Sequence, residues 1–207
     1  SAASDVYKRQ SNKKIREQLE GLSRDDFSEV FLFFDYDVHQ TNLGKADDGD
    51  VINQMLESFD NETENGKLYI SYPMVEALRD FEADKCGNGD NCFVEISDLA
   101  EYKNISSRNS LNPHFRDYNI DVWKEIVNVF SMRISCLLGN AEVISYEQYL
   151  DEANPHDIFM CEQALAGNNK VFIISAFPEF LVDYFGMKLW RTCVKHAKNQ
   201  LDICNCK

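Results

Sequence analysis

The feature of the sequence that most constrains the fold is a run of large apolar residues, Val30 to Phe34, that ends abruptly in Asp35 and Asp37. An apolar run without polar alternation is typical of a central strand in a parallel sheet that helices cover on both faces. Because side chains alternate along a strand, Asp35 and Asp37 point to the same side. Ligands of such sheets bind beyond the carboxyl ends of the strands, so the two acids are placed to share one ligand.

Two carboxylates at this position suit Mg²⁺ or Mn²⁺, which proteins bind through a few carboxylates together with water and substrate phosphate. We therefore expect Asp35 and Asp37 to be metal ligands. The alternative is a polar turn that ends a buried strand, because aspartate is also a common turn residue. The pair alone leaves both interpretations open.

The length and composition predict an ordinary globular protein. The 207 residues are 44% hydrophobic, which is enough to bury the core of one domain. No apolar stretch approaches the roughly 20 residues needed to cross a bilayer, and the amino end lacks a signal-peptide pattern. The seven cysteines lack the dense spacing of a disulfide-bonded secreted domain, so we expect most to be reduced. These features predict a cytoplasmic protein without a membrane partner.

The formal net charge of −14 argues against a broad basic surface for nucleic acid, since phosphate binding depends on Lys and Arg. A nuclease is still compatible with this charge, because a metal ion or another subunit can supply positive charge locally. A nucleic acid substrate, a protein partner and a homo-oligomer are therefore all retained as hypotheses.

The first ten residues, 1–10, resemble a recurrent translation product of sequencing-adaptor DNA at the ends of environmental gene fragments. On this interpretation 1–10 is a non-native tail, the natural sequence begins near Ser11, and a segment before it is missing. The alternative is a natural polar tail. In both cases these residues are left out of the fold prediction.

The segments after the acidic pair alternate between helix and strand signals. Apolar residues from Val51 to Phe59 fall on one helical face, 67–70 is a short buried strand, and Pro73 suits the first turn of a further helix. Such alternation predicts an α/β fold, with a layered sheet of mainly parallel strands and helices on both faces. We assign 11–83 to this unit.

The remaining chain is expected to be more helical. Residues 84–118 form an irregular excursion, in which 98–116 receives no predicted element, and 119–207 is a helix-rich continuation. The continuation is predicted to contain a helix over 122–138, a short strand over 142–144, a helix that Ser145 and Gln148 begin with a capping box, a buried strand over 170–174, and a helix over 178–185 that Gly186 ends.

A hydrophobic strand that ends in Asp-x-Asp, followed by helix, strand and Ser-x-Pro-x-x-Glu, resembles the Toprim domain of topoisomerases, primases and several nucleases. The likeness is greatest to the Toprim-like proteins of bacterial defence. It covers 15–81, and its most specific motif is Asp35-Tyr36-Asp37. The resemblance implies Mg²⁺-dependent phosphodiester cleavage in which Asp35 and Asp37 hold the metal.

Glu76 is the third candidate catalytic residue. In the defence-linked proteins a glutamate recurs after such a serine and proline, and here Glu76 follows Ser71 and Pro73. The alternative is that Glu76 complements a helix dipole, because an acid in the first turn of a helix is favoured by roughly 0.3–1 kcal/mol.

Toprim proteins also carry a glutamate at the end of an earlier strand, one helix before the Asp-x-Asp strand. Here a helix is predicted over 13–22, but no such strand precedes it. Neither Glu17 nor Glu29 ends a buried strand, so neither takes its place. The resemblance therefore implies a truncated fragment that binds metal weakly and is inactive by itself.

Two other functions compete with the nuclease. A phosphatase of the haloacid-dehalogenase type would use Asp35 as nucleophile, Asp37 as general acid and Ser71 as a phosphate ligand. Against it, His39 stands where that family has Thr or Val, and no later strand ends in its acidic pair. The third hypothesis is a binding or regulatory α/β subunit without turnover, which the acidic composition fits.

Cysteine and histidine side chains raise a separate zinc hypothesis. Two cysteines lie in one polar stretch and three further candidates lie near the carboxyl end, but neither spacing matches the usual Cys-x-x-Cys hairpin. The candidates are Cys86, Cys92, His196, Cys204 and Cys206.

Overall fold

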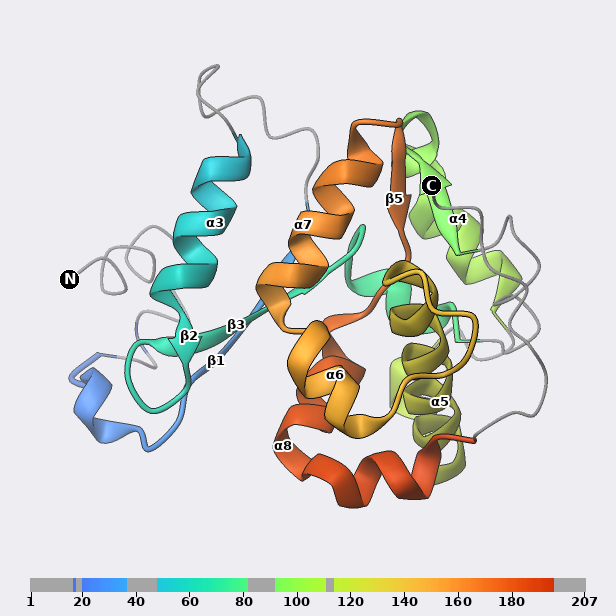
Figure 1. Ribbon diagram of the computed structural model, residues 1–207. Coiled ribbons are helices and arrows are strands. Elements are labelled where there is room, and N and C mark those ends of the chain that lie inside the picture. Colours follow the sequence, from blue (N-terminus) through green and yellow to red (C-terminus); the bar gives the residue numbers. More distant parts are fainter. Residues whose placement is uncertain (1–16, 18–19, 37–47, 82–91, 111–113, 196–207) are drawn as a thin grey trace.

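The computed structural model describes residues 17, 20–36, 48–81, 92–110 and 114–195. In these ranges the chain is a mixed α/β protein (Figure 1). Segment 1–10 and most of the predicted helix over 13–22 lie outside them. In chain order the elements are η1 (Arg24–Asp26), β1 (Phe31–Asp35), α3 (Asp48–Ser58), β2 (Asp60–Asn61), β3 (Gly66–Ser71), η2 (Val75–Arg79), β4 (Phe93–Glu95), η4 (Ile96–Asp98), α4 (Leu99–Asn109), η5 (Phe115–Asp117), α5 (Ile120–Leu137), α6 (Tyr146–Glu152), α7 (Pro155–Ala166), β5 (Lys170–Phe172) and α8 (Ala176–Cys193).

The first sheet contains β1, β2 and β3. β1 and β3 pair in parallel with Asp35 opposite Ser71, and the short β2 is antiparallel to β3. The strands predicted over 30–34 and 67–70 and the helix between them are confirmed. The predicted central position of the first strand is wrong, because the strand order β1-β3-β2 places β1 at the edge.

The strand predicted over 170–174 is confirmed as β5, but it lies in another sheet. β5 does not join the first sheet but pairs with β4 in a separate antiparallel sheet, with Phe172 opposite Phe93. A single bridge between Tyr72 and Ile174 links the residues that follow β3 and β5. The expectation of a mainly parallel sheet is therefore corrected, since β1 and β3 are the one parallel pair in the part of the chain that the structure describes.

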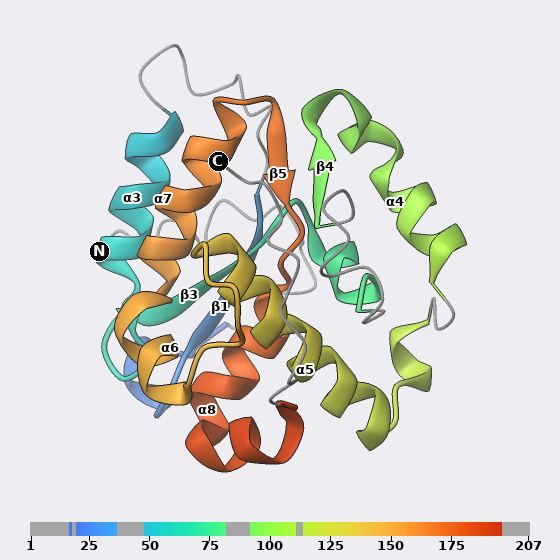
Figure 2. The same ribbon diagram turned by 45° about the vertical axis from the view of Figure 1, so that its right-hand side comes forward.

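Helices cover both faces of the first sheet, as predicted (Figure 2). On one face, the Phe180 ring of α8 packs against Phe31 and Tyr69, with ring centroids 4.8 and 5.8 Å apart. On the other face, Leu68 and Ile70 are buried in the main core together with α3 and α7. The separation follows from strand alternation, because Tyr69 points opposite to its two neighbours.

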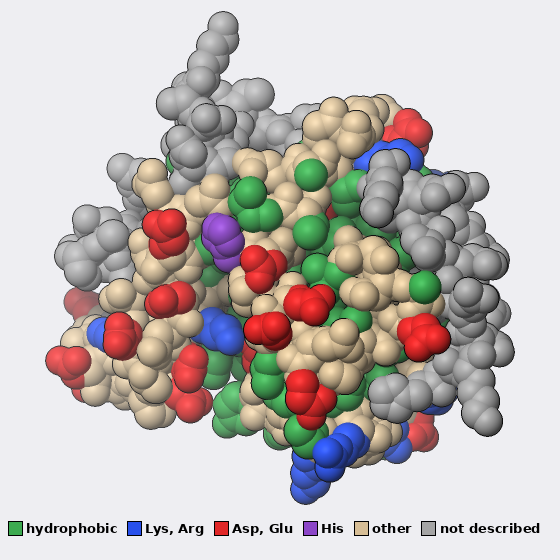
Figure 3. Space-filling view, viewed as in Figure 1, with side chains coloured by type: hydrophobic (Ala, Val, Ile, Leu, Met, Phe, Trp, Pro, Cys, Tyr) green, Lys and Arg blue, Asp and Glu red, His purple; other side chains and the backbone are tan. Residues whose placement is uncertain are grey.

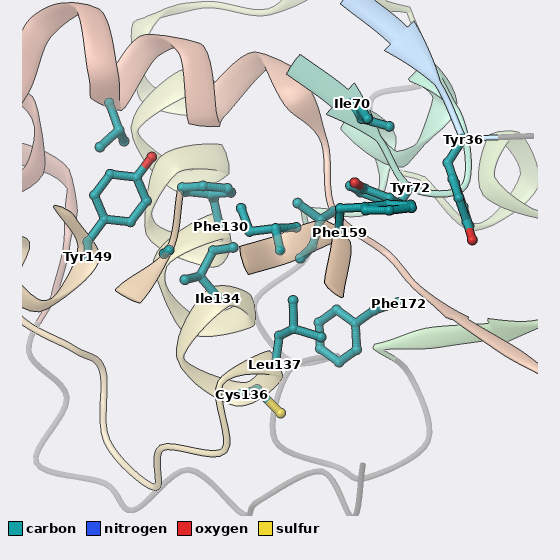
Figure 4. Packing of buried hydrophobic residues seen from close by; sticks show 14 of the residues in the cluster. Tyr36, Ile70, Tyr72, Phe130, Ile134, Cys136, Leu137, Tyr149, Phe159 and Phe172 are labelled. Atoms are coloured by element: carbon teal, nitrogen blue, oxygen red, sulfur yellow. The ribbon is translucent and has the colours of Figure 1, made fainter. Parts of the chain in front are cut away.

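The main core extends from this second face to α5 and α6 (Figure 4). Ile134 of α5 and Phe172 of β5 are inaccessible to solvent, and Phe159 of α7 and Tyr72 are nearly so. The apolar stripe predicted over 122–138 is confirmed as α5, which contributes one side of this core. None of the helices in the described ranges is long and apolar enough to span a bilayer.

Polar side chains cap the first turns of several helices. Asn119 accepts two backbone N–H groups at the start of α5, and Asn154 does the same at the start of α7, ahead of Pro155. The predicted capping box is confirmed, because Ser145 Oγ accepts the N–H of Gln148 and Gln148 Oε1 accepts the N–H of Ser145.

Three short segments differ from the prediction. Residues 142–144 form no strand, and the Ile144 N–H donates instead to Ser135 Oγ of α5 at 3.0 Å. Pro73 does not begin the next helix: it follows a cis peptide bond, and the 3-10 helix η2 begins at Val75. The stretch over 98–116 without a predicted element contains α4.

α8 changes direction at Gly186, whose φ of 65° lies in the left-handed region that glycine adopts without steric cost. The predicted interruption at this residue is confirmed, although helical structure resumes after it. The first half of α8 packs on the sheet, and the second half carries Trp190 into contact with Tyr149, with ring centroids 5.2 Å apart.

Arg24 ties the segment before β1 to the turn between β2 and β3. Its Nε donates to the carbonyl oxygen of Glu64 at 2.6 Å and its Nη2 to that of Glu62 at 2.8 Å, while Nη1 donates to Phe27. The Val30 N–H donates to the same Glu62 carbonyl at 2.9 Å. Together these bonds anchor the start of β1 beside β3.

Candidate functional site

Asp35 ends β1 and carries its carboxylate at the carboxyl edge of the parallel strand pair. Asp35 Oδ1 accepts the N–H of Val75, the first residue of η2, at 2.8 Å. This bond joins the end of one strand to the segment that follows its parallel neighbour. Asp35 is exposed, and its Oδ2 makes no hydrogen bond within the described ranges, so this oxygen is available to a ligand.

Glu76 lies next to Val75 and is brought to the same edge of the sheet. It is 7% exposed, and its Oε1 lies 3.1 Å from Nζ of Lys103, an exposed residue of α4. Carboxylates are rarely buried without a counterion, and Lys103 supplies one. The site therefore combines two acids from neighbouring elements with one cation from a third.

The two acids are close enough to affect one another electrostatically. Burial is the main cause that raises the pKa of Asp35 above its ordinary value, and the negative charge of Glu76 raises it further. The Val75 N–H and the positive charge of Lys103 act in the opposite direction. This end of the sheet therefore concentrates negative charge, which a bound cation would relieve.

The structure brings together two of the three predicted site residues. Asp35 and Glu76 lie at one edge of the sheet, whereas Asp37 lies outside the described residues, as does His39. Sequence reasoning missed Lys103, which lies in the stretch without a predicted element. A single lysine in a polar helix has no sequence pattern that would predict a role in the site. Lys103 reaches Glu76 because α4 packs beside η2.

Ser71 lies opposite Asp35 in the strand ladder and is 3% exposed. Its Oγ accepts the N–H of Ala176, the first residue of α8, at 3.2 Å. The hydroxyl thus links the end of β3 to the start of α8. A phosphate-binding role for Ser71, as in the phosphatase hypothesis, would require this buried hydroxyl to become accessible to the ligand.

A second layer of polar residues lies behind Glu76. The Tyr102 hydroxyl of α4 donates to Asp80 at 2.7 Å, and Arg133 Nη1 donates to the carbonyl oxygen of Ile173 at 2.9 Å. Burial is the main cause that raises the pKa of Tyr102 well above its ordinary value, and Asp80 and Glu76 raise it further. The bond between Tyr102 and Asp80 fixes the end of η2 against α4, which holds Glu76 in place.

The donor atoms in the described ranges fit part of a metal site. Asp35 and Glu76 offer carboxylate oxygens, the type that Mg²⁺ and Mn²⁺ prefer. No group of three or more His, Cys, Asp or Glu side chains within the described ranges could hold a metal ion by itself. A complete site there would need a further ligand, which Asp37 is predicted to supply.

Of the zinc candidates, Cys92 alone lies within the described ranges, where it is buried, and no group of three or more His, Cys, Asp or Glu side chains is found there that could hold a metal ion. Cys86, His196, Cys204 and Cys206 lie outside the described ranges.

Comparison with known proteins adds nothing to the geometry. No family model matches the chain, and neither a curated protein nor a solved structure is detectably similar to it. The Toprim resemblance therefore rests on the residues of the chain alone.

Proposed function

We propose that this chain carries the metal-binding edge of a Mg²⁺-dependent, Toprim-like nuclease, of the kind that acts in bacterial defence. One observation carries the proposal: Asp35 at the end of β1 accepts the N–H of Val75 at 2.8 Å, which brings Asp35 and the adjacent Glu76, after the end of the parallel strand β3, to the same edge of the sheet. Paired acids at the carboxyl ends of parallel strands are a common basis for binding cations and phosphate.

Each residue has a proposed role. The Val75 N–H holds Asp35 Oδ1 and leaves Oδ2 directed to the ligand. Asp37, two positions further along, is the proposed additional metal ligand. Glu76, which Lys103 holds by an ion pair, is proposed to orient the attacking water, and the exposed Lys103 ammonium to attract the phosphate. A divalent cation bound by the aspartates would polarise the phosphodiester and stabilise the charge that develops during cleavage.

Metal binding is the first test, because it needs only residues that this chain contains. Mn²⁺ binding is measured by electron paramagnetic resonance of the free ion and by calorimetry, for the native chain and for Asp35→Asn and Asp60→Asn. Asp60 is the matched control, an exposed acid of the same sheet. We expect Asp35→Asn to weaken binding at least about tenfold, equivalent to about 1.4 kcal/mol, and Asp60→Asn to leave it unchanged. Equal affinities for all three chains would refute the metal assignment.

Cleavage is the second test. Supercoiled plasmid and a structured RNA are incubated with the chain in Mg²⁺, in Mn²⁺ and in chelator. Metal-dependent cleavage that Asp35→Asn abolishes and Asp60→Asn preserves would support the nuclease and identify its substrate class. If a cleavage activity copurifies but survives Asp35→Asn, Asp35 is not its metal ligand.

A further inference from the structure

β1 combines the composition of a central strand with the position of an edge strand. Its first four residues, Phe31 to Phe34, are all large and apolar, yet β1 pairs only with β3 in the described ranges. Edge strands in native proteins are usually short, charged or covered, because an open apolar edge favours pairing with another strand. An edge with this composition therefore suggests a further strand beside it.

The hydrogen-bonding pattern shows which groups face this open edge. The Val30 carbonyl accepts the N–H of Lys67, and the Tyr36 N–H donates to the carbonyl of Ser71, so the even-numbered residues face β3. Because the groups of a parallel ladder alternate, the odd-numbered residues turn their N–H and C=O groups to the outside. Within the described ranges these outward groups have no backbone partner; they belong to Phe31, Phe33 and Asp35.

Several apolar side chains near this edge are exposed. Phe33 is 39% exposed and stacks on Phe177 of α8, with ring centroids 4.9 Å apart. Phe177 also lines an apolar cleft of about 400 Å³ between α5 and α8. Further along α8, Tyr184 and Phe185 are more than half exposed. Exposed apolar side chains beside unpaired backbone groups of a strand are typical of a protein interface.

We propose that the occupant of this edge is a second copy of the chain, whose β1 pairs antiparallel to the first across a two-fold axis at Phe33. In this register the outward groups of the two strands meet each other, with Phe33 opposite Phe33 and Phe31 opposite Asp35. Aromatic cross-strand pairs stabilise such a junction. The two-fold pairing makes the edge self-complementary without any other component.

The dimensions of the sheet limit this assembly to two copies. The opposite edge of the sheet is β2, which has only two residues and offers little to pair with. A two-fold contact through β1 therefore uses the long free edge of each chain and closes. The product is a six-stranded sheet in which Phe31 of the second copy lies beside Asp35 of the first.

Charge predicts how this association responds to salt. Each chain has a net charge of −14, and acidic side chains are spread over the face seen in Figure 3. Two copies therefore repel one another at long range. The two Asp35 residues lie roughly 13 Å apart along the paired strands, which exceeds the Debye length of about 8 Å at physiological salt. Added salt should therefore strengthen the dimer, whereas it would weaken the binding of a basic partner.

The test measures the mass of the chain by analytical ultracentrifugation from low micromolar to near-millimolar concentration, at low and high salt. We expect a reversible shift from the 23.9 kDa monomer to twice that mass, at lower concentration in high salt. Phe33→Pro removes the outward N–H together with the aromatic ring and should weaken dimerisation at least about tenfold; edge positions tolerate proline, so the strand should still form. Phe33→Ala keeps the N–H and should weaken it less.

Two further measurements keep the proposal falsifiable. Circular dichroism and urea denaturation check that Phe33→Pro still folds. Amide hydrogen exchange of Phe31, Phe33 and Asp35 in the native chain should slow as concentration rises, which requires no variant. A monomer at all concentrations, a dimer unaffected by Phe33→Pro, or exchange that is slow in the monomer, meaning that another part of the same chain covers the edge, would each overturn the proposal.

Discussion

The acid at the sheet edge and two acids in the interior share a raised pKa but lie in different surroundings. Asp35 lies at the exposed edge, whereas Glu162 of α7 and Glu179 of α8 are almost completely buried. For all three side chains, burial is the main cause of a raised pKa. The difference lies in what accompanies burial.

At the edge, opposing groups counter the cost of ionisation. The Val75 N–H and Lys103 both lower the pKa of Asp35, and one carboxylate oxygen of Asp35 is open. In the interior, Glu162 has a single opposing group, the N–H of Phe172. For Glu179, the charge of Asp183 raises the pKa further and the charge of Lys67 lowers it, but burial outweighs Lys67. Partial burial with solvent access leaves an acid that can bind a ligand, whereas complete burial favours a protonated packing group.

The largest expected effect is on the interior. Glu162 Oε2 accepts the Phe172 N–H at 2.9 Å, so Glu162→Ala should leave this group of β5 unpaired and open a cavity. We expect a loss of about 2–4 kcal/mol in the free energy of unfolding, measured by urea denaturation. Glu162→Gln keeps an acceptor and should lose less than about 1 kcal/mol. Equal losses for the two variants would show that the hydrogen bond is unimportant.

The second prediction concerns pH. Because the folded chain raises the pKa of Glu179, it holds this proton more tightly than the unfolded chain does. The free energy of unfolding is then greatest below the ordinary glutamate pKa and falls as pH rises toward the folded value. Glu179→Gln should reduce this slope at pH values above the ordinary glutamate pKa, as measured by urea midpoints. Glu57→Gln, at an exposed position of α3, is the control and should keep the native slope.

At the edge, stability and ligand binding should respond in opposite directions. The raised pKa of Asp35 means that its ionised form costs folding free energy, so Asp35→Asn should be neutral or stabilising by about 0–1 kcal/mol at neutral pH. The gain should vanish below the ordinary aspartate pKa, where the carboxyl is protonated in both states. Urea denaturation at neutral and acid pH measures it. A loss above about 2 kcal/mol would make Asp35 a structural residue.

The smallest effect is expected at Lys103. Its ion pair with Glu76 lies at the surface on the lysine side, so Lys103→Met should change the free energy of unfolding by only about 0–1 kcal/mol. The same change removes a positive charge that lowers the pKa of Asp35, which should therefore rise. Carbon NMR titration of the Asp35 carboxyl measures the shift, with Lys188→Met on α8 as control. An unchanged Asp35 pKa would separate Lys103 from the site.

The parts of the fold that sequence patterns predicted are those with local causes. The apolar run of β1, the helical stripe of α5 and the capping box at Ser145 each specify their element within a few residues. The pairing of β5 could not be predicted, because its partner β4 has only three residues and follows a polar stretch. The position of β1 at the edge could not be predicted either, because its composition is that of a central strand.

The same distinction applies to the candidate site. Asp35 and Glu76 could be predicted because each lies just after a recognisable strand. Lys103 could not, because its role depends on how α4 packs against η2, which no local pattern determines. Asp37 stays a prediction.

The Arg24 clamp has a practical consequence for handling the protein. The guanidinium donates to backbone carbonyl oxygens. Side-chain substitutions at the three acceptor residues leave these oxygens in place. The contacts that align β1 beside β3 thus begin at residue 24. Affinity tags or fluorescent fusions attached ahead of this residue should leave Asp35 undisturbed, whereas labels inserted between Arg24 and β1 would release the strand from its anchor.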